Sequence, residues 1–442
     1  DGPYLATNTT TTTLTPASAS VGTGVNITAS AITGINGGAG FQTTDVGRII
    51  SFNSGKAKIT SRTSTTVVVC TITTAFTNTN ATAAFNLGAF SDTTGHPSCV
   101  SFFEQRLVFA GTLDEPQTLF FSKAGDYENM TTGTNADDAM VYTIASNQVN
   151  AIRYMKAVRT LVVGTTGGEF TVSADGTDAS ITPTNITIKR QSSFGSANVD
   201  AIPAGNAILF LQKAKRKIRE LQYNFDSDGY QAPDLTILNE TVTDTGINEM
   251  SYQQEPGSNI WCVRDDGVLA CLTYQRSENV IAWSRHIFGG EFGSGRAVCE
   301  SIASISGTLT EDEVWVIVKR TINGATKRYV ECFSDFDFDE TDANDFKFLD
   351  SHLSYSGSAT TTLSGLAHLE GQTVSILADG AAHANKTVSS GAITLDRSAT
   401  KACVGLSYDS ILQTMRIEGG AAEGTSQGKI KRISKVVLRL FE

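Results

Sequence analysis

The sequence predicts an all-β protein in which a β-propeller is flanked by small β-barrel or sandwich modules. The main observation is a strand signal that returns about every fifty residues across the middle of the chain. Each repeat has a short apolar run, a turn and a second apolar run, which is typical of propeller blades. Two further observations agree: helical periodicity is scarce, and the early part of the chain alternates apolar with polar residues. Ring-shaped scaffolds of this kind often bind or assemble rather than catalyse.

The first ninety residues are rich in Thr, Ser, Asn and Gly. Gly47–Phe52 and Thr66–Ile72 are predicted strands, and a turn is expected at Asn53–Gly55. We therefore expect residues 1–90 to form a small Thr-rich β module. The run Thr9–Thr13 is predicted to be a hairpin tip or an edge strand.

Residues 91–345 are predicted to form the propeller, with about five blade-like repeats. The spacing of the first apolar runs is 54, 48, 52 and 54 residues, measured between Leu107, Leu161, Leu209, Trp261 and Trp315. The second runs are Leu119–Phe121, Glu169–Val172, Ile218–Tyr223, Val268–Tyr274 and Tyr329–Phe333. Large rings fill the outer part of a blade, so we expect core positions for Trp261, Trp283 and Trp315.

One segment of the propeller region leaves two interpretations open. Ala151–Leu161 has Ile152, Met155 and Val158 at helical spacing, so it is either a helix or a strand followed by a turn.

The acidic run Asp335–Asp342 ends the propeller region and is predicted to be a solvated linker. It lacks the glycine and glutamate that an EF-hand calcium loop has at its sixth and twelfth positions.

Residues 346–415 are predicted to form a second small β module after the propeller. Gly371–Ile376, with a turn at Asp379–Gly380, resembles Gly47–Phe52 and its turn, which predicts that the two modules are related. Residues 416–442 are predicted to be a linker and a returning strand. Because Lys435–Phe441 reads as an unfinished strand, we expect the chain to be a fragment of a longer polypeptide.

Composition excludes several classes of function. The net charge of -11 argues against tight binding of nucleic acid, which requires a dense basic surface, but it permits transient, non-specific contact with DNA. No apolar stretch is long enough for membrane insertion, and the chain start is unlike a signal peptide. The seven cysteines form no CxxC pair and are expected to be buried, reduced thiols. The histidines have no metal-ligand spacing to them, so neither a metal nor a cofactor is expected.

No motif predicts catalysis. Gly424–Gly428 matches the G-x-S-x-G string, but it lies in a glycine-rich linker without the strand and helix that a nucleophile elbow needs. No zinc-protease, Walker or dinucleotide-binding pattern occurs. We therefore expect that the protein is not an enzyme and has no catalytic residues.

The densest basic cluster lies at the predicted hairpin turn of the third blade, and it comprises Lys213, Lys215, Arg216, Lys217 and Arg219. One interpretation is a solvated turn that keeps a strand edge from aggregating. The other is a ring of positive charge, multiplied by oligomeric symmetry, that touches DNA phosphates or a neighbouring subunit. The five residues are therefore candidates for a DNA channel or a subunit interface.

Several stretches resemble one protein family. They are His96–Gly111, Glu115–Leu119, Ser122–Asp126, Lys189–Gly195, Ile218–Tyr223, Trp261–Gly267, Leu272–Tyr274, Ala282–His286 and Leu369–Val374. Together they resemble the tail nozzle proteins of short-tailed bacteriophages, also called tail tubular protein B or stabilisation proteins. The resemblance covers roughly residues 90 to 410, and its first block is the most specific. Nozzle subunits are usually longer than this chain.

The resemblance implies a homo-oligomeric ring of six copies, with a β-propeller in each subunit, below the phage portal and adaptor. DNA would leave the capsid through its channel, and tail fibre or spike proteins would dock outside. The protein would belong to the virion tail and be assembled in the bacterial host cytoplasm. The family has no catalytic residues. The alternative function is a glycan-binding or glycan-cleaving β-propeller acting on host surface polysaccharide, because two suitably spaced carboxylates would suffice. A propeller-type scaffold for protein interactions is a third possibility.

Overall fold

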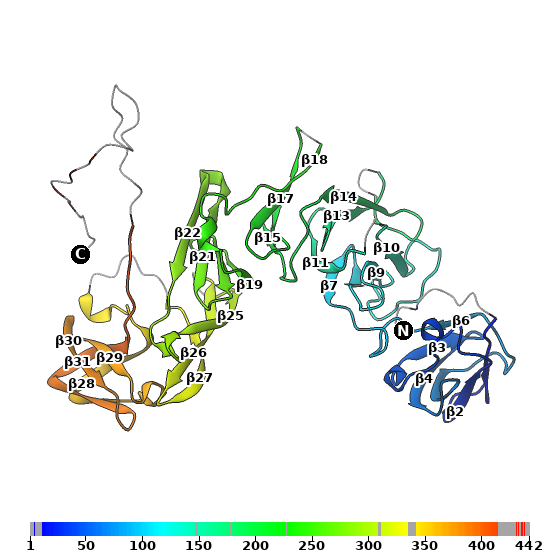
Figure 1. Ribbon diagram of the computed structural model, residues 1–442, viewed down its shortest axis with the longest axis horizontal. Coiled ribbons are helices and arrows are strands. Elements are labelled where there is room, and N and C mark those ends of the chain that lie inside the picture. The colour runs from blue at the N-terminus through cyan, green and yellow to red at the C-terminus, as the bar shows by residue number, and fades with distance from the viewer. Residues whose placement is uncertain are drawn as a thin grey trace. The chain divides into compact units, whose positions relative to one another are not determined.

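The computed structural model describes residues 4, 11–145, 149–176, 179–226, 228–307, 311–334, 342–413, 430, 432, 435 and 437. Over these residues the protein is all-β, with antiparallel sheets and short 3-10 turns, as predicted (Figure 1). The chain divides into two compact units, residues 1–250 and residues 251–442. Among the described residues, no helix is long and apolar enough to span a lipid bilayer.

Unit 1 begins with a six-stranded sheet in the order β1-β2-β5-β4-β3-β6, called the N-terminal module. Its strands are β1 (Leu14–Pro16), β2 (Gly22–Ala29), β3 (Ile49–Phe52), β4 (Gly55–Arg62), β5 (Val67–Thr74) and β6 (Phe85–Leu87). Two 3-10 turns, η1 (Asn36–Gly38) and η2 (Thr43–Asp45), precede β3. A backbone bridge between Leu14 and Thr82 joins β1 to the approach of β6, so the two sheet edges come together as in a curled half-barrel.

The core of the N-terminal module comes from alternate residues of its strands. Ile50, Ile59, Val68 and Ile72 are fully buried or nearly so, while the residues between them face outward, because side chains alternate across a pleated strand. The predicted strands at Gly47–Phe52 and Thr66–Ile72 correspond to β3 and β5. The strand β4 between them was not predicted.

Five blade-like sheets follow, and each is an antiparallel meander in chain order. Blade 1 consists of β7 (Cys99–Phe103), β8 (Arg106–Ala110), β9 (Thr118–Phe121) and β10 (Met140–Thr143). Blade 2 consists of β11 (Ile152–Ala157), β12 (Leu161–Thr165), β13 (Gly168–Ser173) and β14 (Thr187–Ser192). Blade 3 consists of β15 (Ile202–Ala204), β16 (Ala207–Leu211), β17 (Ile218–Asn224) and β18 (Gly229–Gln231).

The remaining two blades belong to unit 2, apart from the first residues of β19. Blade 4 consists of β19 (Ile247–Gln253), β20 (Asn259–Arg264), β21 (Leu269–Gln275) and β22 (Val280–His286). Blade 5 consists of β25 (Val298–Ile305), β26 (Glu313–Ile322) and β27 (Ala325–Cys332). Between them lie the 3-10 turn η4 (Arg276–Glu278) and a small ribbon of β23 (Glu291–Phe292) and β24 (Gly295–Arg296), and η3 (Glu240–Val242) lies before β19.

The predicted repeat is confirmed strand by strand. The five first runs form the second strands of the blades, β8, β12, β16, β20 and β26. The five second runs form the third strands, β9, β13, β17, β21 and β27.

Two further predictions concern single segments and residues of the blades. Of the two interpretations for Ala151–Leu161, strand plus turn is confirmed by β11 and the turn before β12. Trp261 lies in the core as expected. Trp315 is 36% exposed, so the predicted core position was wrong for it, because its neighbours Val314 and Val316 face the core with blade 4 and Trp315 points to the opposite side of β26.

Neighbouring blades within each unit share their cores. Met155 and Leu161 of blade 2 pack with Val108 and Phe121 of blade 1 in one apolar cluster. Every residue of β12 and of β16 is buried. Blades 1 and 3 cover the two faces of β12, because Leu161 packs with blade 1 and Val162 packs with blade 3. In β26 buried residues alternate with more exposed ones, because a single face packs on blade 4.

Unit 2 ends in the C-terminal module, a four-stranded sheet in the order β28-β31-β29-β30. Its strands are β28 (Asp350–Ser364), β29 (Thr373–Ala378), β30 (Ala381–Thr387) and β31 (Ala392–Leu406), with 3-10 turns η5 (Ala343–Asp345) and η6 (Ala367–Leu369).

The two modules repeat one backbone pattern. Gly47 N–H donates to Ile59 O while Ile59 N–H donates to Arg48 O, and Gly371 N–H donates to Val388 O while Val388 N–H donates to Gln372 O. Each module thus has a 3-10 turn, a positive-φ glycine and a strand in the same order.

Several predictions fall on residues that the structure leaves undescribed. Thr9 and Thr10, most of Asp335–Asp342, the whole of Gly424–Gly428, and most of Lys435–Phe441 lie outside the described residues. Thr11–Thr13 are described and lead directly into β1, which lies at one end of the strand order of its sheet. All seven cysteines are described, and none of them forms a disulfide. Six are buried, as expected, but Cys332, at the end of the largely exposed strand β27, is exposed, so the expectation was wrong for it.

Candidate functional site

The basic cluster lies where it was predicted, at the turn between β16 and β17 in blade 3. Lys215 takes a positive φ of 62° and its N–H donates to Gln212 O, which closes the turn. Lys213 N–H donates to Gly195 O, so the turn is also attached to the connection between blades 2 and 3.

Three of the five basic side chains have partners within unit 1. Lys217 Nζ lies 2.8 Å from Asp234 Oδ2 and 3.6 Å from Glu240 Oε1, and the hydrogen bond to Asp234 raises the pKa of Lys217. Lys215 Nζ donates to Asn248 Oδ1 at 2.8 Å. These contacts hold the turn against the segment that follows blade 3.

Arg219 points along the sheet rather than into solvent. Its guanidinium carbon lies 3.5 Å from the centre of the Phe194 ring, a cation–π contact. Its Nη1 donates to Ala232 O and its Nε donates to Gln212 Oε1. Burial lowers the pKa of Arg219, although Asp234 and Glu169 oppose that effect.

Lys213 and Arg216 differ from the other three. Both side chains are exposed, and among the described residues neither has an ion-pair partner. Within the part of the chain that the structure describes, the turn therefore presents two cations without an ion-pair or hydrogen-bond partner for the side chain, instead of five. If the cluster binds an anionic partner or a neighbouring subunit, Lys213 and Arg216 are the residues positioned to do so.

A buried carboxylate, which sequence reasoning missed, lies beside the turn. Glu169 on β13 is fully buried and accepts hydrogen bonds from Ser192 Oγ, from Ser196 Oγ at 2.8 Å and from the Phe194 N–H. It thereby fixes the connection of residues 192–196, whose Phe194 lies under Arg219. Burial raises the pKa of Glu169, while its hydrogen bonds and Arg219 lower it.

Glycine is required within this connection. Gly195 has a φ of 74°, and a Cβ placed there would lie 2.4 Å from Thr166 O. Glu169, Arg219 and Gly195 therefore explain the conformation of the end of the stretch Lys189–Gly195. This stretch is one of those that carry the family resemblance.

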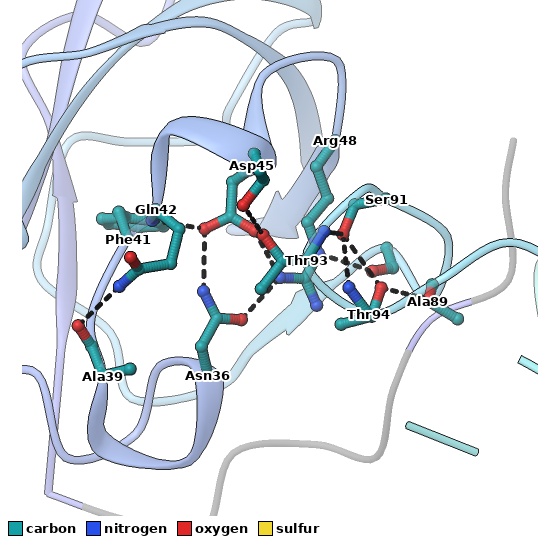
Figure 2. A network of polar contacts seen from close by, with 12 residues as sticks. Asn36, Ala39, Phe41, Gln42, Asp45, Arg48, Ala89, Ser91, Thr93 and Thr94 are labelled. Atoms are coloured by element: carbon teal, nitrogen blue, oxygen red, sulfur yellow. Dashed lines mark hydrogen bonds and ion pairs between the residues drawn. The ribbon is translucent and has the colours of Figure 1, made fainter. Parts of the chain in front are cut away.

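A second polar network lies in the N-terminal module (Figure 2). Arg48 and Asp45 form a fully buried ion pair, with Arg48 Nη1 3.0 Å from Asp45 Oδ1. Arg48 Nη1 also donates to Asn36 Oδ1, and its Nε donates to Gly88 O at 2.6 Å. Asp45 Oδ2 accepts from the Gln42 N–H and from Asn36 Nδ2.

This network joins η1, η2 and the start of β3 to the segment after β6. Figure 2 shows the Ser91–Thr94 turn beside it, where Thr94 Oγ1 donates to Ala89 O. Burial lowers the pKa of Arg48 in spite of Asp45. Arg48 Nη2 is buried without a hydrogen-bond partner among the described residues, whereas its Nη1 and Nε and both oxygens of Asp45 are hydrogen-bonded. The network therefore connects four segments of the N-terminal module through a buried ion pair.

The described residues offer no arrangement that could hold a metal ion, since no three His, Cys, Asp or Glu side chains among them are suitably grouped. The geometry defines propeller blades and two small β modules, and it defines a basic turn in blade 3 at which Lys217 is ion-paired with Asp234. The class of the fold is therefore all-β with propeller blades.

Comparison with known proteins gives no family. No family model and no curated protein matches the chain. Among solved structures, a putative phosphatase from Bacteroides thetaiotaomicron is 10% identical, with 70% of this chain and 82% of that chain covered and a TM-score of 0.32. A β-propeller domain from Myceliophteria thermophila is 8% identical, with 64% and 85% covered and a TM-score of 0.33.

A third structure, the phage phi92 endosialidase, is 13% identical, with 98% of this chain and 62% of that chain covered and a TM-score of 0.19. Similarity at this level carries no argument about function.

The raised pKa of Glu169 leads to a testable pH dependence. A carboxyl whose folded pKa lies above its unfolded value of about 4.5 stabilises the fold fully below that value, and this contribution is lost as the pH rises through the folded pKa. In the Glu169→Gln variant, the free energy of unfolding should therefore fall less as the pH rises above 4.5 than it does in the wild type. Urea unfolding of the wild type and the variant at several pH values measures this.

Glu278→Gln, at an exposed position in η4, is the matched control and should leave the pH profile unchanged. If the stability of Glu169→Gln depended on pH above 4.5 in the same way as that of the wild type, the ionisation of the buried carboxylate would not be coupled to folding.

Proposed function

We propose that the protein is a structural subunit of a short-tailed phage tail, which forms an oligomeric nozzle ring through which DNA is ejected and on which fibres or spikes dock. The observation that carries the proposal is that four of the stretches of family resemblance, separated in the sequence, contact one another as two pairs in the structure. Such pairing is expected if the resemblance reflects a shared fold.

The first pair joins blade 1 to the loop that follows β9. Arg106, in the stretch His96–Gly111, is buried and donates to Ser122 O at 2.8 Å, and Leu107 N–H donates to Ser122 Oγ. Ser122 begins the stretch Ser122–Asp126. The two stretches thus form one hydrogen-bonded unit.

The second pair joins blades 2 and 3. Phe194, in the stretch Lys189–Gly195, lies under Arg219 of the stretch Ile218–Tyr223. We propose that these contacts serve a structural role and that the protein is not an enzyme.

The charge distribution is compatible with a conduit. A chain of net charge -11 does not hold DNA strongly, because tight binding relies on many phosphate contacts by lysine and arginine. Lys213 and Arg216, repeated in each copy of a ring, would supply weak contacts to passing DNA or to a neighbouring subunit. Six copies, a phage adaptor, and fibre or spike proteins are the partners that the proposal implies.

Mass measurement and electron microscopy of the purified chain test the proposal. A nozzle should give a closed ring of six copies, with six times the chain mass of 46.9 kDa. A persistent monomer that cleaves or binds host polysaccharide would contradict the proposal and favour the glycan-directed alternative.

Paired variants then test the basic turn. Lys213→Ala with Arg216→Ala should weaken ring assembly or salt-dependent DNA contact without changing the melting temperature, because both side chains are free of internal partners. Lys217→Ala, which removes a cation already paired with Asp234, is the control and should leave assembly and DNA contact intact. If the double variant and Lys217→Ala had equal effects, a special role for Lys213 and Arg216 would be ruled out.

A further inference from the structure

The tripeptide Ile-Asn-Gly occurs twice in the chain, as Ile35–Gly37 and as Ile322–Gly324. Both copies form turns with similar φ angles: φ is 48° at Asn36 and at Asn323, and it is 61° and 71° at the glycines that follow. Asn-Gly is the sequence that left-handed turns of this kind favour. Because the tripeptide and its φ angles agree, a difference in reactivity between the two asparagines has to come from their surroundings.

Asparagine followed by glycine is prone to spontaneous deamidation, because glycine has no side chain to shield the backbone nitrogen between the two residues. That nitrogen attacks Cγ of the asparagine and loses its proton to water. The bond from Cγ to Nδ2 breaks, ammonia leaves, and a succinimide ring forms. Water then opens the ring at either carbonyl and gives aspartate or isoaspartate. The net reaction consumes a water molecule and releases ammonia.

The fold holds the side chain of Asn36 in place. Its Nδ2 donates to Asp45 Oδ2 at 2.7 Å and to Gly40 O at 3.0 Å, and its Oδ1 accepts from Arg48 Nη1 at 2.7 Å. The side chains of Asp45 and Arg48 are fully buried, so water cannot readily replace these bonds. Rotation of the amide toward the nitrogen of Gly37 would break them. Asn36 is therefore protected while the N-terminal module is folded.

Asn323 lacks these restraints. It is exposed at the tip of the hairpin β26–β27, just beyond the last strand pair, Ile322 with Ala325. Among the described residues, no hydrogen bond holds its side-chain amide. We infer that Asn323 is a site of spontaneous deamidation in the folded protein, whereas Asn36, in the same tripeptide, is protected by its hydrogen bonds.

The hairpin tip that carries Asn323 lies against the C-terminal module. Gln372 Nε2 donates to Thr321 O at 3.3 Å, and a Cβ placed on Gly371 would lie 3.8 Å from Asn323 Cα. Both products replace a neutral amide with a carboxylate, and isoaspartate also adds a carbon atom to the main chain. Deamidation therefore disturbs the turn and adds a negative charge where blade 5 meets the C-terminal module.

Peptide mapping of the purified chain after incubation at neutral pH tests the inference. Trypsin releases residues 321–327 as one peptide and residues 1–48 as another, since it cleaves after lysine and arginine. Mass spectrometry with fragmentation then locates the mass gain of about one dalton at either asparagine. In the folded protein, Asn323 should convert at least about tenfold faster than Asn36, because Asn36 reacts only after local opening.

The same incubation in urea that unfolds the chain is the matched control. The two rates should become similar there, because the tripeptide is the same and the hydrogen bonds of Asn36 are lost. Equal rates in the folded protein, or no conversion of Asn323 while the unfolded chain converts, would overturn the inference. A ratio of rates that unfolding leaves unchanged would also overturn it, because the flanking sequence rather than the fold would then cause the difference.

Discussion

Replacement of Asp45 by alanine is expected to lower the free energy of unfolding of the N-terminal module by about 3–5 kcal/mol. Asp45 and Arg48 are both fully buried, and Asp45 also accepts hydrogen bonds from Gln42 and Asn36. Removal of the carboxylate leaves the guanidinium of Arg48 buried without its counter-charge, and that is the main physical cost. Chemical denaturation followed by circular dichroism measures the change.

A double variant separates the loss of the pair from the cost of an unpaired charge. Asp45→Ala combined with Arg48→Met should be less destabilising than Asp45→Ala alone, because it removes the buried cation as well. Asp396→Ala, which breaks the exposed pair with Lys386, serves as the control and should have little effect. A similar small effect of Asp45→Ala would contradict the importance of the network in Figure 2.

Replacement of Arg106 by methionine is expected to cost about 2–4 kcal/mol. The Arg106 side chain is buried and donates to the carbonyl oxygens of Ser122, Ala136 and Asp138 at 2.7–2.8 Å. Methionine fills most of the space but donates no hydrogen bond, so the loop of residues 136–138 loses its attachment to blade 1. Urea unfolding gives the loss of stability, and hydrogen exchange should show faster opening of this loop.

Arg216→Met provides the matched comparison, since Arg216 is an exposed arginine of the basic turn. Its effect on stability should stay within about 0.5 kcal/mol, as for most surface substitutions. If Arg106→Met were equally harmless, the hydrogen bonds of Arg106 would not be what joins blade 1 to the loop.

The blade repeat could be predicted because central strands leave a strong pattern in the sequence. The residues of β12 and β16 are all buried, so these strands appear as continuous apolar runs at regular intervals. Strands with exposed or half-buried polar residues left a weaker pattern. Residues Thr187–Ser192 of β14 are half-buried or exposed and largely polar, and β4 carries Lys56 and Lys58 among its apolar residues. Their pairing depends on neighbouring strands rather than on their own composition.

The basic turn could be located from the sequence, but the state of its charges could not. Lys217 and Arg219 are close in sequence to Lys213 and Arg216, yet their partners Asp234 and Phe194 come from other segments. The buried Glu169 was missed for the same reason, because its serine donors lie on a connection more than twenty residues away.

From the sequence alone, the all-β class, the five repeats and the place of the basic turn within blade 3 could be determined. Each depends on local periodicity and turn residues, which a strand carries in its own sequence. The tertiary structure alone decided which charged groups are buried, as with Arg48, Arg106 and Glu169, and which cations of the basic turn have partners, as with Lys217 and Arg219. These properties depend on segments distant in sequence that exclude water from one another, and no local pattern records that exclusion.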